Sequence, residues 1–261
     1  MQGDLFAKKR RDSLVFFALL IAITCVSIVI TKYDVEKGFT SIPKAISWAF
    51  SNFYPNEKSL EKLPDILLKL KETVLISVAA ASVASLFALL FAIFGSETTG
   101  INGFMRKITR GIATLFRNID VSAWAMILLF SFGQSALTGY FALFFGSFGF
   151  LTRAFTEAID EISSSSVEAL QATGASYFAI IFQSVIPTCL PQIISWVLFM
   201  IETNIRSATL VGILTGTGIG FAFNLYYKNL NYHTASLVVI VVVVAIMIIE
   251  NLSNYIRRVI L

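Results

Sequence analysis

Long apolar stretches, separated by short polar segments, are the feature that most limits how this chain can fold. A helix that crosses the roughly 30 Å hydrocarbon core of a bilayer needs about 20 predominantly apolar residues. Only 14% of the 261 residues are charged, whereas a soluble domain carries about 25%. We therefore predict an all-α integral membrane protein with six transmembrane helices. The six stretches lie within residues 13–30, 73–94, 118–132, 137–151, 187–205 and 235–249, the last lengthened by flanks from 232 to 255.

The placement of basic residues predicts the orientation of these spans. Lys and Arg concentrate in cytosolic segments next to membrane spans, and the run KKRR at residues 8–11 directly precedes the first stretch. Six spans then place both termini in the cytosol. No small-residue cleavage site follows the first stretch, so we expect a retained span rather than a signal peptide.

Three regions follow from this topology. Residues 1–31 form a basic tail and the first transmembrane helix, residues 32–71 an extracytoplasmic amphipathic segment, and residues 72–255 a compact transmembrane domain. Within the second region, AISWAFSNFY is predicted to form a short amphipathic helix at the membrane surface, ended by Pro55. Its interfacial aromatic residues are Trp48, Phe50, Phe53 and Tyr54.

Composition argues against catalysis by this chain. An intramembrane enzyme needs a nucleophile–base pair or metal ligands within its spans, but the single histidine, His233, falls at a span end. No HExxH or GxSxG motif with partners is found, so we predict no catalytic residues, no metal site and no nucleic-acid partner. An intramembrane enzyme remains the remote alternative. Cys25 and Cys189 are expected at different depths, so we expect no disulfide between them.

The polar segment VEALQATGASYFAIIFQSVIP, at residues 167–187, stands out between two apolar stretches. Ser165 followed by Glu168 fits a capping box, and Gly174 is suited to cap the resulting short helix. A second helical piece is expected to run to Pro187, which marks the break before the next span. Such a protruding helix suits docking into a groove of a partner protein; the alternative is a plain connecting loop.

Charged residues follow in the next span. Glu202 and Arg206 are four residues apart and share a helix face, with Asn204 to the side. Helical rise places Glu202 about 22 Å beyond Pro187, and Arg206 is then expected near the outer end. A charge at such depth faces a partner or a wet cavity. The three residues are therefore candidates for lining a translocation path, and a self-satisfied ion pair is the alternative.

Four glycines, Gly212, Gly216, Gly218 and Gly220, come next in the chain. GTGIG is not a phosphate-binding loop, because no GK[ST] follows and no strand precedes it. The glycines are predicted to allow close helix packing, or to provide a bend that moves during gating.

The segment at residues 157–187 resembles the EAA loop of ABC-importer permeases, written E-A-A-x3-G-x9-I-x-L-P. Glu168, Ala169, Gly174 and Pro187 match the pattern, and the departures are Leu170, Ser184 and Ile186. The resemblance implies the fold of a type I ABC importer permease, in which this loop is a coupling helix seated in a cleft of the ATPase. It assigns ATPase coupling to the four matching residues. It also implies that this chain binds no cofactor, and that ATP and Mg are held by a cytosolic ABC ATPase dimer.

A further resemblance is to phosphonate ABC-transporter permeases. It rests on IETNIRSATLVGILTGTGIGF at 201–221, on FTEAIDEISSSSVEALQATGAS and on SNFYPN, whereas FGQSALTG is less rich in Gly and Pro than the corresponding loop. The resemblance implies import of phosphonates across the cell membrane by a multi-pass permease. The implied partners are an extracytoplasmic phosphonate-binding protein, a second permease copy (identical or a sister subunit) and membrane lipid. Alternative solutes are phosphite, an organophosphate ester or methionine.

Overall fold

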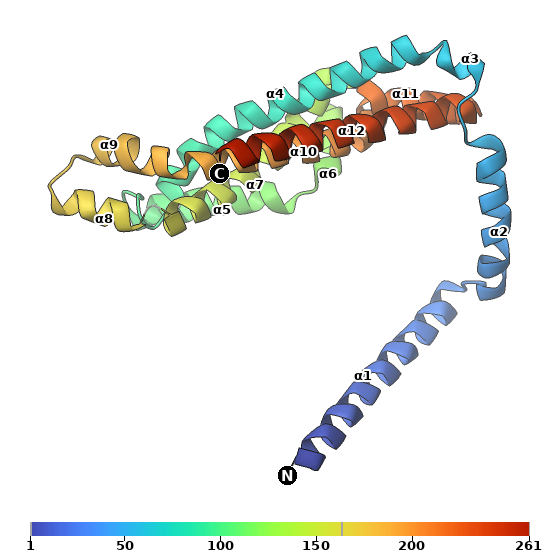
Figure 1. Ribbon diagram of the computed structural model, residues 1–261, viewed down its shortest axis with the longest axis horizontal. Helices are drawn as coiled ribbons and strands as arrows, with labels where there is room; N and C mark the ends of the chain where they lie inside the picture. Colours follow the sequence, from blue (N-terminus) through green and yellow to red (C-terminus); the bar gives the residue numbers. More distant parts are fainter. Residues whose placement is uncertain (1, 163, 261) are drawn as a thin grey trace. The chain divides into compact units, whose positions relative to one another are not determined.

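The computed structural model describes residues 2–162 and 164–260, with the side chains of residues 9–162 and 165–260. All regular structure in these ranges is helical (Figure 1), as predicted. The chain forms two units, Met1–Phe53 and Tyr54–Leu261, which we describe separately. Their boundary falls inside the predicted segment 32–71. Lys8, part of the basic run used to orient the chain, lies outside the described side chains.

The first unit contains α1 (Gln2–Thr31) and α2 (Val35–Asn52). In α1 the apolar part Lys9–Thr31 is long enough to cross a membrane and none of it is buried. The side chain of Asp34 caps α2 by accepting a hydrogen bond from the Lys37 amide. A helix is present in the predicted segment, but it begins ten residues earlier than expected and ends just before Phe53, while its place at the membrane surface stays a prediction. Its exposed apolar residues Val35, Phe39, Ile42, Ile46 and Phe50 recur at helical spacing.

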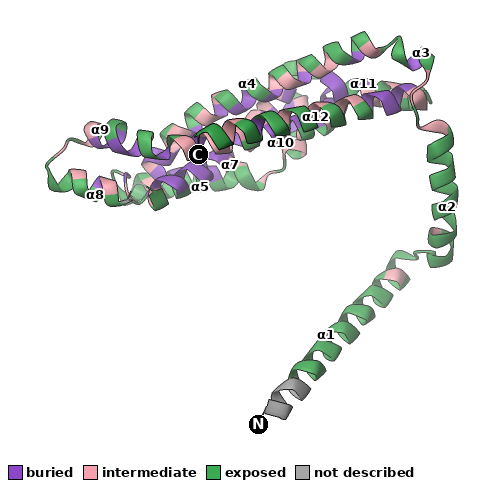
Figure 2. Ribbon diagram, in the orientation of Figure 1, coloured by how far each residue is buried: buried purple, intermediate pink, exposed green. Residues whose placement is uncertain are grey.

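The second unit is a bundle in which α7 packs mainly against α4, α5, α6 and α10. Burial is concentrated where these helices face one another (Figure 2). The helices are α3 (Glu57–Leu60), α4 (Leu63–Gly95), α5 (Gly103–Asn118), α6 (Val121–Phe132), α7 (Ala136–Ile162), α8 (Ser164–Ala172), α9 (Tyr177–Ile180), the π-helical turn η1 (Ile181–Val185), α10 (Ile186–Thr215), α11 (Gly218–Lys228) and α12 (Tyr232–Ile260).

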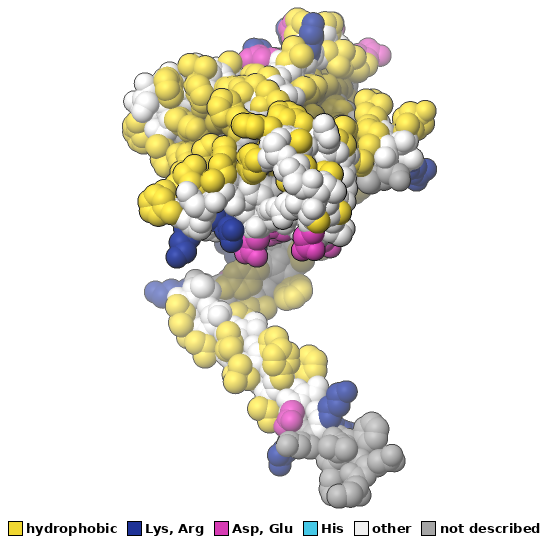
Figure 3. Space-filling view, turned by 90° about the vertical axis from the view of Figure 1, so that its left-hand side faces the viewer, with side chains coloured by type: hydrophobic (Ala, Val, Ile, Leu, Met, Phe, Trp, Pro, Cys, Tyr) yellow, Lys and Arg dark blue, Asp and Glu magenta, His cyan; other side chains and the backbone are white. Residues whose placement is uncertain are grey.

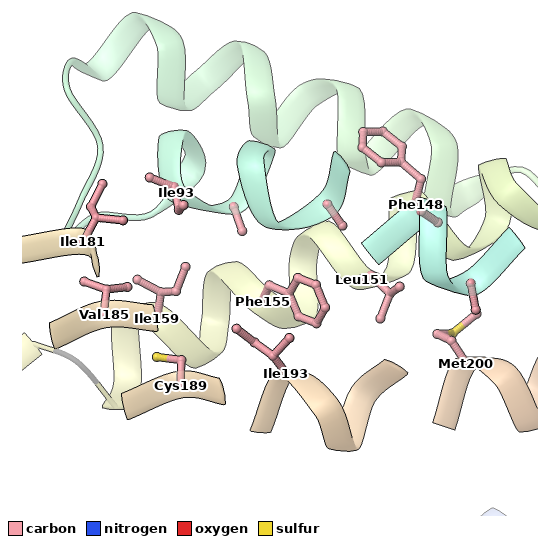
Figure 4. Packing of buried hydrophobic residues seen from close by; sticks show 14 of the residues in the cluster. Ile93, Phe148, Leu151, Phe155, Ile159, Ile181, Val185, Cys189, Ile193 and Met200 are labelled. Atoms are coloured by element: carbon pink, nitrogen blue, oxygen red, sulfur yellow. The ribbon is translucent and has the colours of Figure 1, made fainter. Parts of the chain in front are cut away.

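Small residues allow α4 and α7 to approach closely. Ala81, Ala84, Ala88 and Ala92 lie on one face of α4 and are fully buried, which is the kind of interface on which helices pack in a membrane. Larger side chains of α7, η1 and α10 fill the remaining space (Figure 4). They include Leu151, Phe155, Ile159, Val185 and Ile193.

The predicted span at 118–132 is not one straight helix. The α6 helix has 12 residues and reaches about 18 Å, short of the hydrocarbon core. It meets α5 at an angle of 91°. The bend wraps around α7 at Gly149, where an added Cβ would lie 2.4 Å from the Arg117 amide nitrogen. The close approach therefore requires glycine at this position.

Among the residues that the structure describes, four helical segments are long and apolar enough to cross a membrane, or up to five if the bent α5–α6 pair is one span. The predicted span at 137–151 lies inside α7, which composition alone does not identify as a span. Its Thr, Gly and Ser residues and its charged second half lower its hydropathy. A helix surrounded by protein needs little apolar outer surface. The interior position of α7 therefore explains why the hydropathy of this predicted span is low.

The remaining expectations for single residues concern cysteine and histidine. Cys25 and Cys189 are both free thiols, as predicted. His233 at the start of α12 lies with Nδ1 2.7 Å from the Tyr54 carbonyl oxygen and with its ring edge-on to that of Tyr54. The histidine therefore has a structural role, joining α12 to the segment before α3.

Candidate functional site

The segment predicted to dock on a partner forms the α8–α9 hairpin at one end of the second unit (Figure 1). Val167 is buried and Leu170 is half-buried against the core, whereas Glu168, Ala169 and Ala172 are exposed. One face of α8 thus holds it to the bundle and the opposite face is open. The helix begins at Ser164, so Ser165 lies inside it rather than at the predicted cap position.

Gly174 ends α8 as the sequence indicates. Its φ angle is +78°, in the left-handed region that glycine adopts without strain. The Ala175 amide donates to the Leu170 carbonyl and the Gly174 amide to the Gln171 carbonyl, at 3.2 and 3.0 Å. This pair of bonds is a Schellman motif, which satisfies the last carbonyls of the helix.

The chain continues from this elbow as one long helical segment, Tyr177–Thr215. The hydroxyl of Ser176 caps its first turn by accepting from the Ala179 amide. The predicted break at Pro187 is wrong, because α10 runs through this residue. The π-helical turn Ile181–Val185 precedes it, and the Ile186 amide donates to the Ile181 carbonyl. This wider turn accommodates a proline ring that would clash in regular α-helix.

Glu202 is buried and paired with two arginines. It contacts Arg206 on its own helix, and its Oε2 lies 3.9 Å from Nη2 of Arg257 on α12. This arrangement favours the ion-pair alternative for Glu202. Arg257 lies in the last turn of α12, so Glu202 and Arg206 lie beside the end of α12 that the sequence predicts to be cytosolic. The expected outer position of Arg206 and the predicted cytosolic C-terminus therefore conflict, and both stay predictions.

Asn204 and the glycines pack inside the unit. Asn204 is buried and donates from Nδ2 to the Ser147 hydroxyl of α7 at 2.8 Å. Gly216, which caps the end of α10, and Gly218, the first residue of α11, have φ angles of +70° and +60°. An added Cβ at Gly220 would lie 1.9 Å from the Thr209 carbonyl oxygen. These contacts favour close packing, while a path-lining role for Asn204 and a gating role for the glycines, including Gly212, stay predictions.

Sequence reasoning missed a polar network beside the hairpin. Oδ1 of Asp160, on the last turns of α7, accepts from the Ser96 hydroxyl and the Glu97 amide at 2.5 and 2.7 Å. Its Oδ2 lies 3.2 Å from Nη2 of Arg110 on α5. A signal was available, because the polar run SETTG directly follows an apolar stretch and an acidic residue ends another.

A polar cavity of about 300 Å³ adjoins this network between α5 and α7. Ala113 is its one apolar lining residue; the others are Thr109, Arg110, Thr114, Thr152, Arg153, Thr156, Glu157 and Asp160. Figure 3 looks at the end of the second unit that carries α8 and α9: apolar side chains cover much of it, and acidic and basic side chains gather along its lower edge. The charged residues that line the cavity, Arg110, Arg153, Glu157 and Asp160, belong to α5 and α7.

Residues 84–260 match a family of proteins described as binding-protein-dependent transport system inner membrane components. A phosphate-import permease protein of Mycolicibacterium smegmatis is 26% identical over 74% of this chain, and the match spans 36% of that relative. A phosphite transport system permease protein of Stutzerimonas stutzeri is 25% identical over 72% of this chain and 68% of the relative. A protein of Escherichia coli named for a cryptic phosphonate transport system is 31% identical over 45% of this chain and 96% of the relative.

Solved structures share the fold. One is a methionine ABC transporter in inward-facing conformations, with a TM-score of 0.68 and 18% identity over 79% of this chain and 99% of that chain. Another is a bacterial ABC transporter that imports the polysaccharide alginate, with a TM-score of 0.64 and 17% identity over 97% of this chain and 98% of that chain. At these identities the similarity concerns the fold alone.

Proposed function

This chain belongs to the binding-protein-dependent transport system inner membrane components, and from that premise we propose that it imports phosphonates. As a member of the family it is a multi-pass cell-membrane permease subunit of an ABC importer rather than an enzyme. The ATPase of such an importer is a separate subunit. The phosphonate assignment is supported by relatives named for phosphonate and phosphite transport.

The observation that carries the mechanism is the open face of α8. Glu168 and Ala169 are exposed on a short helix whose other face is fixed by Val167 and whose end is fixed by Gly174. A rigid helix anchored on one side transmits a push from a partner to the bundle behind it. We assign this face to a groove of the ATPase, so that Glu168, Ala169, Gly174 and Pro187 form the coupling segment.

The remaining parts of the proposal follow from the importer class. An ATPase dimer binds ATP and Mg in the cytosol, and a binding protein delivers the phosphonate to the outer face. Two permease copies, identical or sister subunits, form the path between them. The α7 helix supplies the sixth span, so that both termini are cytosolic. Closure of the ATPase dimer moves α8 and switches the path between outward and inward access.

The solute is tested by the ATPase activity of the complete complex in liposomes. The binding protein is added empty, then loaded with 2-aminoethylphosphonate, phosphite or methionine. Stimulation by the phosphonate-loaded protein supports the proposal, and stimulation by another loaded form alone contradicts it. Phosphite is the second candidate because a relative is named for it. Methionine is supported only by a fold shared at 18% identity.

The coupling role is tested by Glu168→Lys. Reversing this exposed charge should abolish binding-protein-stimulated uptake while the permease still inserts and is recovered in normal amount. Glu161→Lys, which reverses another exposed carboxylate close by in the chain, is the matched control and should retain uptake. Normal uptake by Glu168→Lys would rule out the assignment of this face.

A further inference from the structure

Asp160 holds together three segments that are far apart in sequence. Its Oδ1 accepts hydrogen bonds from the Ser96 hydroxyl and from the Glu97 and Thr98 amides, at 2.5, 2.7 and 3.2 Å. Its Oδ2 pairs with Arg110 at 3.2 Å. Hydrogen bonds to an ionised acceptor are roughly twice as strong as neutral ones. One carboxylate of α7 therefore fixes both the turn after α4 and the helix α5.

Arg110 reinforces the same junction from α5. Its Nε donates to the carbonyl of Gly95, the last residue of α4, at 2.8 Å. A basic side chain at a helix end satisfies a carbonyl that has no partner inside the helix. The ends of α4 and α7 and the side of α5 are thus joined through the Asp160–Arg110 pair.

The network reaches the hairpin through Tyr177. The Tyr177 hydroxyl donates to the Thr99 carbonyl at 3.1 Å, and the Thr99 amide donates to the Ser96 hydroxyl at 3.2 Å. Tyr177 is the first residue of α9, three positions after Gly174. A continuous chain of hydrogen bonds therefore runs from the elbow through the turn after α4 to Asp160.

Apolar packing connects the same segments. Ile93 of α4, Ile159 of α7 and Ile181 of η1 belong to one buried cluster (Figure 4). Each is close in sequence to a network residue, namely Ser96, Asp160 and Tyr177. By contrast, an open cavity of about 430 Å³ separates parts of the turn from α8, lined by Thr98, Gln171 and Tyr177 among others. The Tyr177 hydroxyl thus connects the hairpin to the turn after α4 at the edge of this cavity.

We infer that Asp160 is a positioning residue that makes α4, α5, α7 and the hairpin move as one body when the ATPase displaces α8. The inference rests on the proposed coupling role of α8. Without the contacts of Asp160, α8 would still move α7 and α10 through its covalent connections to them. The movement of α4 and α5 would then be smaller than that of α8. ATP would then be hydrolysed with less solute moved.

The first test measures a distance in the permease–ATPase complex. Spin labels are placed at Lys107→Cys on α5 and Ser165→Cys on α8, both exposed, with Cys25 and Cys189 replaced by Ser. The distance between the labels should be the same without nucleotide and with ATP–vanadate. With Asp160→Ala added, it should change or broaden between the two states. A distance that changes without Asp160→Ala, or stays constant with it, overturns the inference.

The second test separates coupling from folding. Asp160→Asn and Tyr177→Phe should lower the solute transported per ATP at least about fivefold, the lower end of usual coupling effects, with Glu161→Gln as the control. A loss of folded complex with an unchanged ratio would overturn the inference. If the ATPase binds none of these proteins, the unsubstituted permease included, the proposed function falls and this inference with it. If the ATPase binds the permease but the label distances contradict the inference, only the inference about Asp160 is overturned and the proposed function stands.

Discussion

At several positions the contacts of a single buried residue show whether its side chain stabilises the fold or is free to take part in transport. Glu202 is the clearest case, because it is buried between Arg206 and Arg257 on two helices. The i,i+4 partner Arg206 was predictable from spacing. Arg257 was not, because sequence spacing cannot show which residue of another helix comes close. The Asp160 network was not predicted for the same reason, because the partners of Asp160 are more than 40 positions away in the sequence.

Replacing Glu202 tests its structural role. Glu202→Ala leaves the partly buried Arg257 without its carboxylate, and should lower the free energy of unfolding by about 1–3 kcal/mol. Arg206→Ala should cost less, because the Arg206 side chain is 49% exposed and water screens it. The measurement is SDS-induced unfolding of the purified permease. Unchanged stability in Glu202→Ala, with a raised KM for uptake, would instead favour the path-lining alternative.

At the scale of helices, the periodic and strongly apolar segments were predicted well. The interiors of α1, α4 and α12 match the predicted spans, because an uninterrupted apolar run leaves few alternatives. The α5–α6 bend and the passage of α10 through Pro187 were missed. The bend depends on the close approach of Gly149 to Arg117, and the proline is accommodated by a π-helical turn. Both are tertiary or rare local features that residue preference does not indicate.

The buried alanine face of α4 should not tolerate a larger side chain. Ala88 is fully buried in the cluster shared with α7, so Ala88→Leu should destabilise the permease by about 1–3 kcal/mol through overpacking. The matched control is Leu86→Ala on the exposed side of the same helix, 66% exposed, which should change stability little. Thermal unfolding of both variants gives the comparison. Equal stability of Ala88→Leu and the parent protein would contradict the close α4–α7 packing.

At the scale of the molecule, topology decides whether the coupling helix lies on the correct side of the membrane. Residues 53 and 173 are separated by α4, the α5–α6 pair and α7. If all three cross the membrane, α2 and the Gly174 elbow lie on opposite sides. In a Cys-free background, Ser41→Cys should react with a membrane-impermeant thiol reagent in intact cells. Thr173→Cys should react only after permeabilisation. Labelling of both positions from the same side would show that α4, the α5–α6 pair and α7 do not all cross the membrane, which contradicts the six-span topology.

The open face of α8 should bind an ATPase, and site-specific photo-crosslinking detects this contact. A photoreactive amino acid is placed at Ala169 on that face, or at Phe39 on the exposed apolar face of α2 as the control. In cells that express the ATPase subunit, illumination should join the ATPase to the Ala169 variant and not to the Phe39 variant. An ATPase adduct at Phe39, or none at Ala169 while the complex is active, would contradict binding of the ATPase at the open face of α8.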